Sequence, residues 1–127
     1  MANGKIKADT LEHSTAGSLD TQYVVNGSAK AWSNYSGSGT TFRDSFNHSS
    51  ATDHGTAKYT VTLTNNMSNT NYSYTSSSTD GSGRSSVFSP RDFDDYLTSS
   101  MRGINNDTGN VTEDTECVSS TFNGDLA

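Results

Sequence analysis

The 127-residue sequence contains few large apolar residues, one cysteine and one proline. Isoleucine, leucine, valine and phenylalanine supply 18 residues, about 14% of the chain. Disordered sequences typically contain less than roughly 20% of these residues, together with a high net charge. The high net charge of such sequences is missing, because the formal net charge is only −6, and six tyrosines and a tryptophan favour order. This composition excludes the large apolar core of a typical globular enzyme. It is typical of a β-rich chain that buries further apolar surface against copies of itself.

The other shortages exclude several classes of partner. The lone Cys117 excludes a disulfide framework and a cysteine-rich zinc site. No apolar run is long enough to span a membrane, and residues 1–11 lack the apolar segment of a secretory signal. The sequence pI is near 4.7, with 8 basic and 14 acidic residues, which disfavours a phosphate-binding surface. We therefore expect no membrane insertion, no nucleic-acid partner and no cofactor.

The acidic residues are concentrated in residues 61–127, which carry 9 acidic and 3 basic side chains. Two carboxylate clusters stand out, at residues 92–95 and 113–116, but no set of nucleophile, base and orienting group accompanies them. The three histidines, His13, His48 and His54, lack ligand spacing within one chain. We expect no enzyme activity, no catalytic residue and no metal site in one chain. A threefold axis would triplicate an axial histidine or aspartate, which leaves a shared ion site open.

Alternation with a period of two residues, punctuated by glycine, asparagine and aspartate, predicts short antiparallel strands. The clearest run is 57–64, where Tyr59, Val61 and Leu63 share one face and threonines share the other. A turn at 53–56 precedes this run, and we expect residues 41–48 to complete a hairpin with it. Further strands are expected at 22–25, leading into the turn dipeptide Asn26-Gly27, and at 29–35, 71–75, 99–105 and 116–122.

The remaining segments are expected to lack strands. Residues 76–83 are predicted to form loops, and residues 92–97 are compatible with either one helical turn or a loop. Residues 1–20 show weak alternation and no strand partner nearby, which predicts an extended arm ordered by another subunit or a docking surface. We therefore expect an arm at 1–21, with Ile6 and Leu11 as attachment residues, and a β-domain at 22–127.

Several stretches between residues 23 and 125 are similar to the C-terminal tip or knob domains of bacteriophage tail-fibre proteins. Residues 24–32 (VVNGSAKAW) and 34–39 (NYSGSG) resemble a motif at the head of those domains. Residues 43–47 (RDSFN), Ser49-Ser50, Thr52-Asp53, Gly55-Thr56 and 59–61 (YTV) resemble the stretch that follows. Asn71-Tyr72 resembles a later strand, and residues 118–125 resemble the last one, with polar Ser120 and Thr121 where apolar residues are usual. Residues 88–101 resemble an insertion.

The resemblance implies an all-β domain, a compact antiparallel sandwich or jelly-roll-like barrel, that forms a homotrimer on the surface of a phage particle. The implied function is that of a virion structural protein, a short tail fibre or fibre tip engaged in host attachment. The alternative is a capsid decoration, cement or head-fibre protein. The implied partners are other virion proteins, contacted through the arm, and a host cell-surface glycan.

Aromatic residues are the candidate anchors, because Tyr and Trp rings stack on sugars and also fill cores. We expect three tyrosines to bind receptor glycans: Tyr35, Tyr74 and Tyr96. We expect seven residues to form the core or the trimer interface: Trp32, Phe46, Tyr59, Val61, Leu63, Tyr72 and Phe122.

Overall fold

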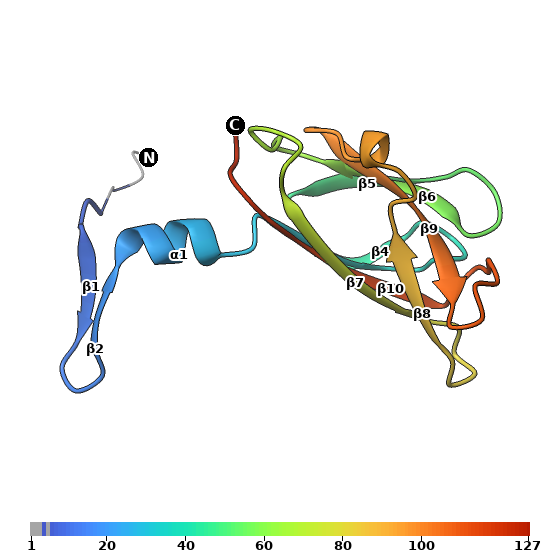
Figure 1. Cartoon of the computed structure of the whole chain (residues 1–127), viewed down its shortest axis with the longest axis horizontal. Helices are drawn as coiled ribbons and strands as arrows, with labels where there is room; N and C mark the ends of the chain where they lie inside the picture. The colour runs from blue at the N-terminus through green and yellow to red at the C-terminus, as the bar shows by residue number, and fades with distance from the viewer. Residues whose placement is uncertain (1–3, 5) are drawn as a thin grey trace.

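Residues 6–27 form an arm that stands apart from a β-barrel (Figure 1). The computed structural model describes residue 4 and residues 6–127. In the arm, strands β1 (Thr10–His13) and β2 (Gly17–Asp20) form a hairpin, and helix α1 (Thr21–Gly27) follows. The barrel is built from eight strands and one 3-10 turn: β3 (Ala31–Tyr35), β4 (Phe42–Phe46), β5 (His48–Asp53), β6 (Lys58–Leu63), β7 (Ser73–Thr79), β8 (Ser85–Ser89), η1 (Phe93–Asp95), β9 (Ser100–Asp107) and β10 (Cys117–Asn123).

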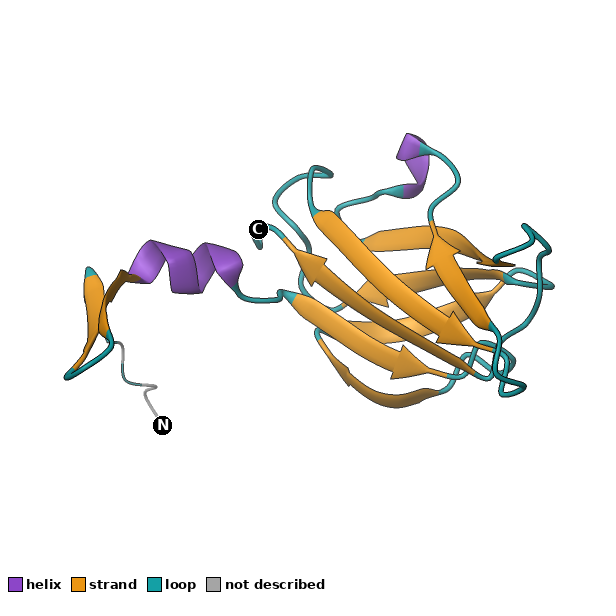
Figure 2. Cartoon of the chain, turned by 60° about the horizontal axis from the view of Figure 1, so that its bottom comes forward, coloured by secondary structure: helices purple, strands orange, loops and turns teal. Residues whose placement is uncertain are grey.

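The eight strands form one antiparallel sheet that curls until it nearly closes (Figure 2). Their order in the sheet is β4-β3-β10-β7-β8-β9-β6-β5, so β4 and β5 are the two edges. These edge strands are consecutive in the chain and only Asn47 separates them. The prediction of an all-β domain is confirmed, and its form is a nearly closed barrel.

Asn47 turns the chain from one edge of the sheet to the other. Its backbone lies in the left-handed region, with φ of 58°, which asparagine tolerates better than most residues. Its side-chain amide donates to the carbonyls of Lys30, at 3.0 Å, and Asn65, at 3.1 Å. Thr64 in turn donates its backbone N–H to the Asn47 carbonyl at 3.0 Å. The corner residue thus connects the start of β3 to the segment after β6.

The interior of the barrel holds a small aromatic core. Tyr59, Val61 and Leu63 point inward from β6, as their alternation predicts, because successive side chains of a strand face opposite sides of a sheet. They join a cluster with buried residues from the other strands: Ala31, Tyr35, Met67, Tyr72, Phe88, Met101, Val118 and Phe122. The ring centroids of neighbouring aromatic residues lie 4.9 to 6.3 Å apart, mostly edge to face.

Polar residues fill the space that the scarce apolar residues leave. Ser33 and Ser120 are buried opposite each other on β3 and β10, and their hydroxyls lie 2.8 Å apart. The fully buried Asn105 donates its side-chain amide to the Thr115 hydroxyl at 2.9 Å. Buried polar groups are tolerated when they are paired in this way. The polar positions Ser120 and Asn105 are therefore parts of the core.

The arm differs from its prediction. In place of an extended segment without a local partner, β1 pairs with β2 in register from Thr10 opposite Asp20 to His13 opposite Gly17. The expected strand at 22–25 is wrong, because these residues belong to helix α1. The predicted boundary between residues 21 and 22 falls inside that helix, and the barrel begins at β3. No helix among the described residues has the length and apolarity to cross a membrane.

Three expectations within the barrel also need correction. The partner of β6 in the hairpin is β5, not residues 41–48, because Asn47 interrupts that run and β4 pairs with β3 instead. Residues 76–79, expected in a loop, continue β7 along the whole of β10. Strand β8 was not predicted at all. For residues 92–97, left open between a helical turn and a loop, the structure has the single turn η1.

Candidate functional site

A shallow trough of about 520 Å³ lies on the outer face of the sheet, across β3, β10 and β7. Nine residues line it: Trp32, Ser33, Asn34, Thr75, Ser76, Ser77, Ser119, Ser120 and Thr121. The hydroxyls of Ser33 and Ser120 are bonded to each other in the core and the Ser76 hydroxyl donates to the Phe88 carbonyl. The outward-facing polar side chains are therefore Asn34, Thr75, Ser77, Ser119 and Thr121. None of these side chains carries a charge. The trough therefore offers one large aromatic surface among neutral hydrogen-bonding groups.

Strand register places the outward residues in two straight rows. Trp32 on β3 lies opposite Thr121 on β10, which lies opposite Thr75 on β7. In the next row, Asn34 is followed by Ser119 and Ser77. Directly opposed residues of an antiparallel sheet project from the same face at about 4.5–5.5 Å between Cβ atoms. The rows give evenly spaced hydroxyl and amide groups beside the indole ring.

Trp32 is the aromatic element of the trough, and 39% of its surface is exposed. On its other side, Trp32 lies opposite Phe46 on the edge strand β4, which is 52% exposed. Both residues were expected in the core or at a trimer interface. In the single chain they form an exposed aromatic pair on the outer face, because they alternate with the inward-facing Ala31 and Ser33 along β3 and with Ser45 on β4.

Hydrogen bonds hold Asn34 in place. Its amide donates to the Ser119 hydroxyl at 3.2 Å, and its side-chain oxygen accepts from Arg43 at 3.4 Å. The Arg43 guanidinium also donates to the Glu116 carbonyl at 2.9 Å, so it is held beside the row. The amide geometry of the trough is therefore preorganised.

The three tyrosines expected to bind glycans do not meet in one place. Tyr35 is fully buried in the core, where burial raises the pKa of its hydroxyl, so its ring is not available to a ligand. The Tyr74 ring faces Phe122 with a centroid distance of 4.9 Å, and burial raises its pKa also. Tyr96 is half-buried against Tyr72, with ring centroids 5.2 Å apart. Tyr96 lies between η1 and β9, outside the strands, and the serine-rich neighbours of Tyr74 gave no indication of which face was outward.

The structure places the other predicted residues as follows. Tyr59, Val61, Leu63, Tyr72 and Phe122 lie in the core. Ile6 is 94% exposed and Leu11 is 49% exposed, both on the arm.

Two carboxylates of the acidic segment 113–116 brace the barrel. Asp114 accepts hydrogen bonds from the Tyr59 hydroxyl at 2.6 Å and from the Ala57 backbone N–H at 2.7 Å. Glu113 accepts from the Ser86 hydroxyl at 2.9 Å. Among the described residues, no three His, Cys, Asp or Glu side chains are grouped so as to hold a metal ion.

The missed element of the site is the row of hydroxyl residues on β7 and β10. Serine and threonine are spread throughout the sequence, so only the pairing of distant strands selects those that share a face with Trp32. Comparison with known proteins adds nothing to this geometry, because no family model, curated protein or solved structure matches the chain.

Proposed function

We propose that this chain is a virion structural protein, a subunit of a bacteriophage short tail fibre or fibre tip, and that it binds neutral surface saccharides of the host in the Trp32 trough. The observation that carries the proposal is the exposed Trp32 ring beside two rows of uncharged hydroxyl and amide groups.

The chemistry of the trough suits a sugar. A tryptophan ring stacks on the C–H face of a pyranose, while a hydroxyl side chain both donates and accepts hydrogen bonds. Serine, threonine and asparagine surround Trp32, and no charged side chain lines the trough. A neutral saccharide is therefore a better match than an ionic ligand. Because the trough is shallow, we expect weak binding by each copy and a higher overall avidity when several copies bind together.

The residues that carry the resemblance to tail-fibre tips support the assignment to a virion. Trp32 belongs to the first matching run and Phe46 to the second. In the structure these two aromatic residues lie opposite each other at the edge of the trough. The second run also includes Asn47, the corner that nearly closes the barrel. The resemblance therefore covers both the frame of the barrel and the aromatic part of the site.

The surface of the arm supports the assembly of several copies. The chain exposes 7911 Å², against roughly 6,500 Å² for a compact monomer of this mass. The difference exceeds the roughly 800 Å² that each partner buries in a standard interface. Exposed Tyr23, Val24 and Val25 make α1 apolar, and no residue of the helix is buried. We propose that the arms of three copies associate through this surface.

The second candidate is a capsid decoration, cement or head-fibre protein. The observation that favours it is an apolar groove of about 290 Å³ in the arm, which includes Ile6, Leu11, Val24 and Val25. An apolar groove on an arm that projects from the barrel is suited to dock on a capsid shell. Immunogold labelling of virions separates the candidates, because label at the tail supports a fibre and label over the head supports decoration.

Fluorescence of the sole tryptophan tests the trough directly. Titration with neutral oligosaccharides from bacterial surface polysaccharides should shift its emission to shorter wavelength as a sugar covers the ring. Trp32→Ala should abolish retention on the immobilised saccharide, whereas Val87→Ala, which removes apolar surface from a 52% exposed position outside the trough, should retain it. Unchanged emission at saturation, or full retention of Trp32→Ala, would overturn the proposed binding site.

A further inference from the structure

The Trp32 trough is longer across the strands than along them. Along each strand its lining covers only three residues, 32–34 on β3, 119–121 on β10 and 75–77 on β7, so its two outward rows lie about 7 Å apart. Across the strands, the row that begins at Trp32 reaches Thr75 on the third strand, roughly 10 Å away at the usual strand spacing. A ligand that fills the trough is therefore elongated and crosses the strands.

The row of Trp32 continues beyond the trough to the edge of the sheet. Phe46 on the edge strand β4 lies opposite Trp32, and its ring is exposed on the same outer face. The complete row takes one residue from each of four adjacent strands: Phe46, Trp32, Thr121 and Thr75. Two aromatic rings therefore stand at one end of a row of roughly 14 Å, and two hydroxyl groups stand at the other.

The second row supplies polar groups along the same length. It runs from Asn34 through Ser119 to Ser77, and Asp44 on β4 lies opposite Asn34. Arg43 precedes Asp44, so the edge strand adds one charge of each sign. A ligand that lies over the first row thus has hydrogen-bonding groups beside each strand that it crosses.

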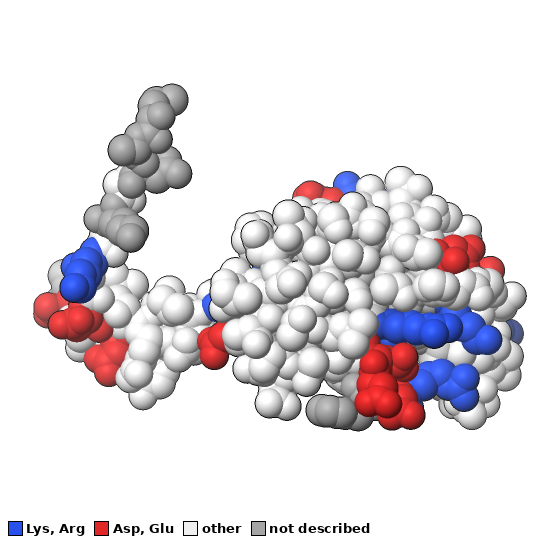
Figure 3. All heavy atoms as spheres, turned by 90° about the horizontal axis from the view of Figure 1, so that it is seen from above, with Lys and Arg blue, Asp and Glu red and all other residues white. Residues whose placement is uncertain are grey.

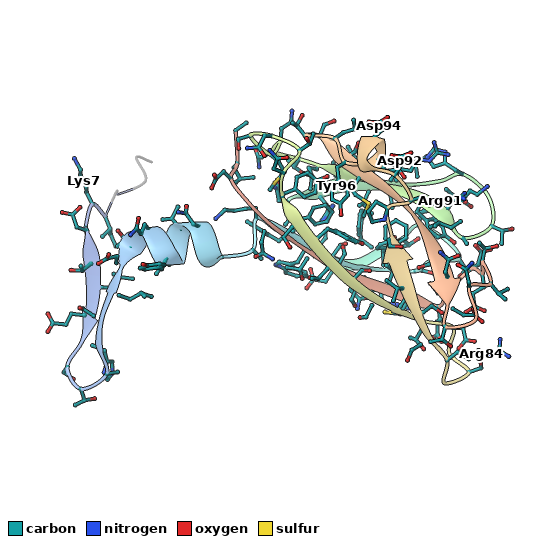
Figure 4. The ribbon with its side chains drawn as sticks, viewed as in Figure 1. Lys7, Arg84, Arg91, Asp92, Asp94 and Tyr96 are labelled. Carbon is teal, nitrogen blue, oxygen red and sulfur yellow. The ribbon has the colours of Figure 1, made fainter. Side chains whose placement is uncertain are left out.

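A second hollow, of about 360 Å³ and beside the turn η1, collects charges that the first row lacks. Five charged residues line it: Lys58, Arg91, Asp92, Asp95 and Arg102. Figure 3 shows basic and acidic side chains close together on one side of the barrel, and Figure 4 shows Arg91 and Asp92 beside η1. Strand β8 separates this part of the sheet from β7. Lys30, two residues before Trp32, donates its ammonium to the Val25 carbonyl and the Ser28 hydroxyl at the junction with the arm.

The spacing of the row identifies a class of ligand. Neighbouring strands lie roughly 5 Å apart, close to the length of one pyranose in a chain whose linkages are equatorial. Successive sugars of such a chain come to lie over successive strands. Phe46 and Trp32 offer ring faces to two of these sugars, and β10 and β7 offer hydroxyl groups to the next two. A coiled chain with axial linkages curves away from the row after one or two sugars.

We propose that the outer face of β4, β3, β10 and β7 binds four consecutive sugars of a linear, equatorially linked neutral polysaccharide, with the chain crossing the strands. This proposal rests on the neutral-saccharide site at Trp32 and adds the length, the direction and the linkage of its ligand. Because β4 is an edge of the sheet, the polymer can continue beyond Phe46.

Calorimetric titration of the full-length protein with cellobiose, cellotetraose and cellohexaose tests the length of the site. These β-1,4-linked glucose oligomers are extended and uncharged. The affinity should rise by about tenfold or more from two to four sugars, since two further sugars reach the hydroxyl groups of β10 and β7, and should change little from four to six. Maltotetraose, a coiled α-1,4-linked chain of the same composition, is the matched control and should bind no better than cellobiose.

A substitution at the far end of the row locates the chain. Thr75→Val removes the hydroxyl group and keeps the β-branched shape that suits a strand. It should weaken cellotetraose by about threefold or more and leave cellobiose unchanged, because the shorter probe stays on the aromatic end. Thr52→Val makes the same change at an exposed threonine of β5, outside the trough, and should leave both affinities unchanged.

Four results would overturn the four-sugar site: equal affinity for cellobiose and cellotetraose, tighter binding of maltotetraose than of cellotetraose, an equal effect of Thr75→Val and Thr52→Val on cellotetraose, or no heat from any of these oligomers. The tryptophan emission separates this failure from failure of the proposed function. If neutral bacterial saccharides still shift the emission of Trp32, the saccharide site stands and only its length, direction and linkage are wrong.

Discussion

Asn47 and Asn65 are held together by hydrogen bonds in both directions. The Asn47 side-chain oxygen accepts from the Asn65 backbone N–H at 2.7 Å and from the Asn65 side-chain amide at 3.0 Å, while the Asn47 amide donates to the Asn65 carbonyl at 3.1 Å. Because Asn47 lies between the two edge strands, this pair ties the open seam of the barrel to the segment that follows β6.

The first prediction concerns this corner. Asn47→Ala should lower the free energy of unfolding by about 2–4 kcal/mol, because it removes several side-chain hydrogen bonds and places alanine at positive φ. Asn47→Gly loses the same hydrogen bonds but tolerates the backbone, so it should be the less damaging variant by about 1 kcal/mol. Urea unfolding measures both. Equal stability of the alanine variant and the wild type would show that the Asn47 hydrogen bonds do not stabilise the barrel at its seam.

The second prediction concerns the two faces of β6. Leu63 is 4% exposed in the core, so Leu63→Ala should cost about 2–5 kcal/mol of unfolding free energy. Thr62 lies on the other face and is half-buried, so Thr62→Ala should stay within about 1 kcal/mol of wild type. Thermal and chemical denaturation measure both variants. A larger loss for Thr62→Ala would mean that the register of the β5–β6 hairpin is wrong.

The third prediction concerns acid. His48 packs between Phe42 and Phe122, and burial lowers its pKa from 6.5 to about 4. The folded barrel therefore favours neutral His48, whereas the unfolded chain takes up a proton below pH 6.5. The stability of the fold that depends on neutral His48 is fully present above pH 6.5 and is lost as the pH falls from 6.5 to about 4. A pKa change of this size corresponds to about 3 kcal/mol. Because His48 is only partly buried, solvent screening reduces it, and we expect roughly 2 kcal/mol of unfolding free energy to depend on pH through this residue.

Denaturant titrations at several pH values measure the His48 contribution. His48→Leu should flatten the loss of stability between pH 6.5 and 4, while carboxylates still contribute at lower pH. His13→Ala, an exposed substitution in the arm, is the matched control and should keep the wild-type profile. The same pH profile in all three proteins would exclude His48 as its source.

The fourth prediction concerns assembly. At micromolar concentration the full chain should sediment as a trimer, at three times the 13.5 kDa of one chain. Val24→Asp places a charge in the exposed apolar surface of α1 and should produce monomers. Val111→Asp changes a 60% exposed valine of the barrel in the same way and should remain trimeric.

Shortening the chain separates folding from assembly. Residues 28–127 retain the whole core cluster, so they should unfold within a few degrees of the full chain while sedimenting as a monomer. Sedimentation of the full chain as a monomer would exclude the trimer. A trimer of residues 28–127 would instead place the interface on the barrel.

Alternation could predict the fold class and several strands, because Tyr59, Val61 and Leu63 can share a face only in a strand. The same rule failed at Gln22–Val25, where four residues are too few to distinguish a period of two from a helical one. It also missed the length of β7, because Ser76, Ser77 and Ser78 show no contrast between faces. There the pairing with β10 on one side determines the strand.

The candidate sites depended on information that sequence patterns lack. Trp32 could be recognised as an anchor, but whether it faced inward depended on the buried Ser33 and Ala31 beside it. The hollow beside the turn η1 joins Lys58 to Arg91 and Arg102, more than thirty positions away in the sequence, through the pairing of β6 with β9 and the loop before η1. Each residue was visible in the sequence, while their proximity arises from register.

The position of β10 between β3 and β7 affects how the protein is made. The Ser33 hydroxyl has its buried hydrogen-bond partner only after Ser120, 87 residues further along the chain, has been synthesised. In the sheet, β10 lies between β3 and β7 and is the strand that connects them. Until residues 117–123 have left the ribosome, β3 and β7 therefore each have an unpaired edge. Pairing over such separations is slow compared with local hairpin formation. The nascent chain therefore has exposed sheet edges until residues 117–123 have left the ribosome, and the barrel can close only from that point on.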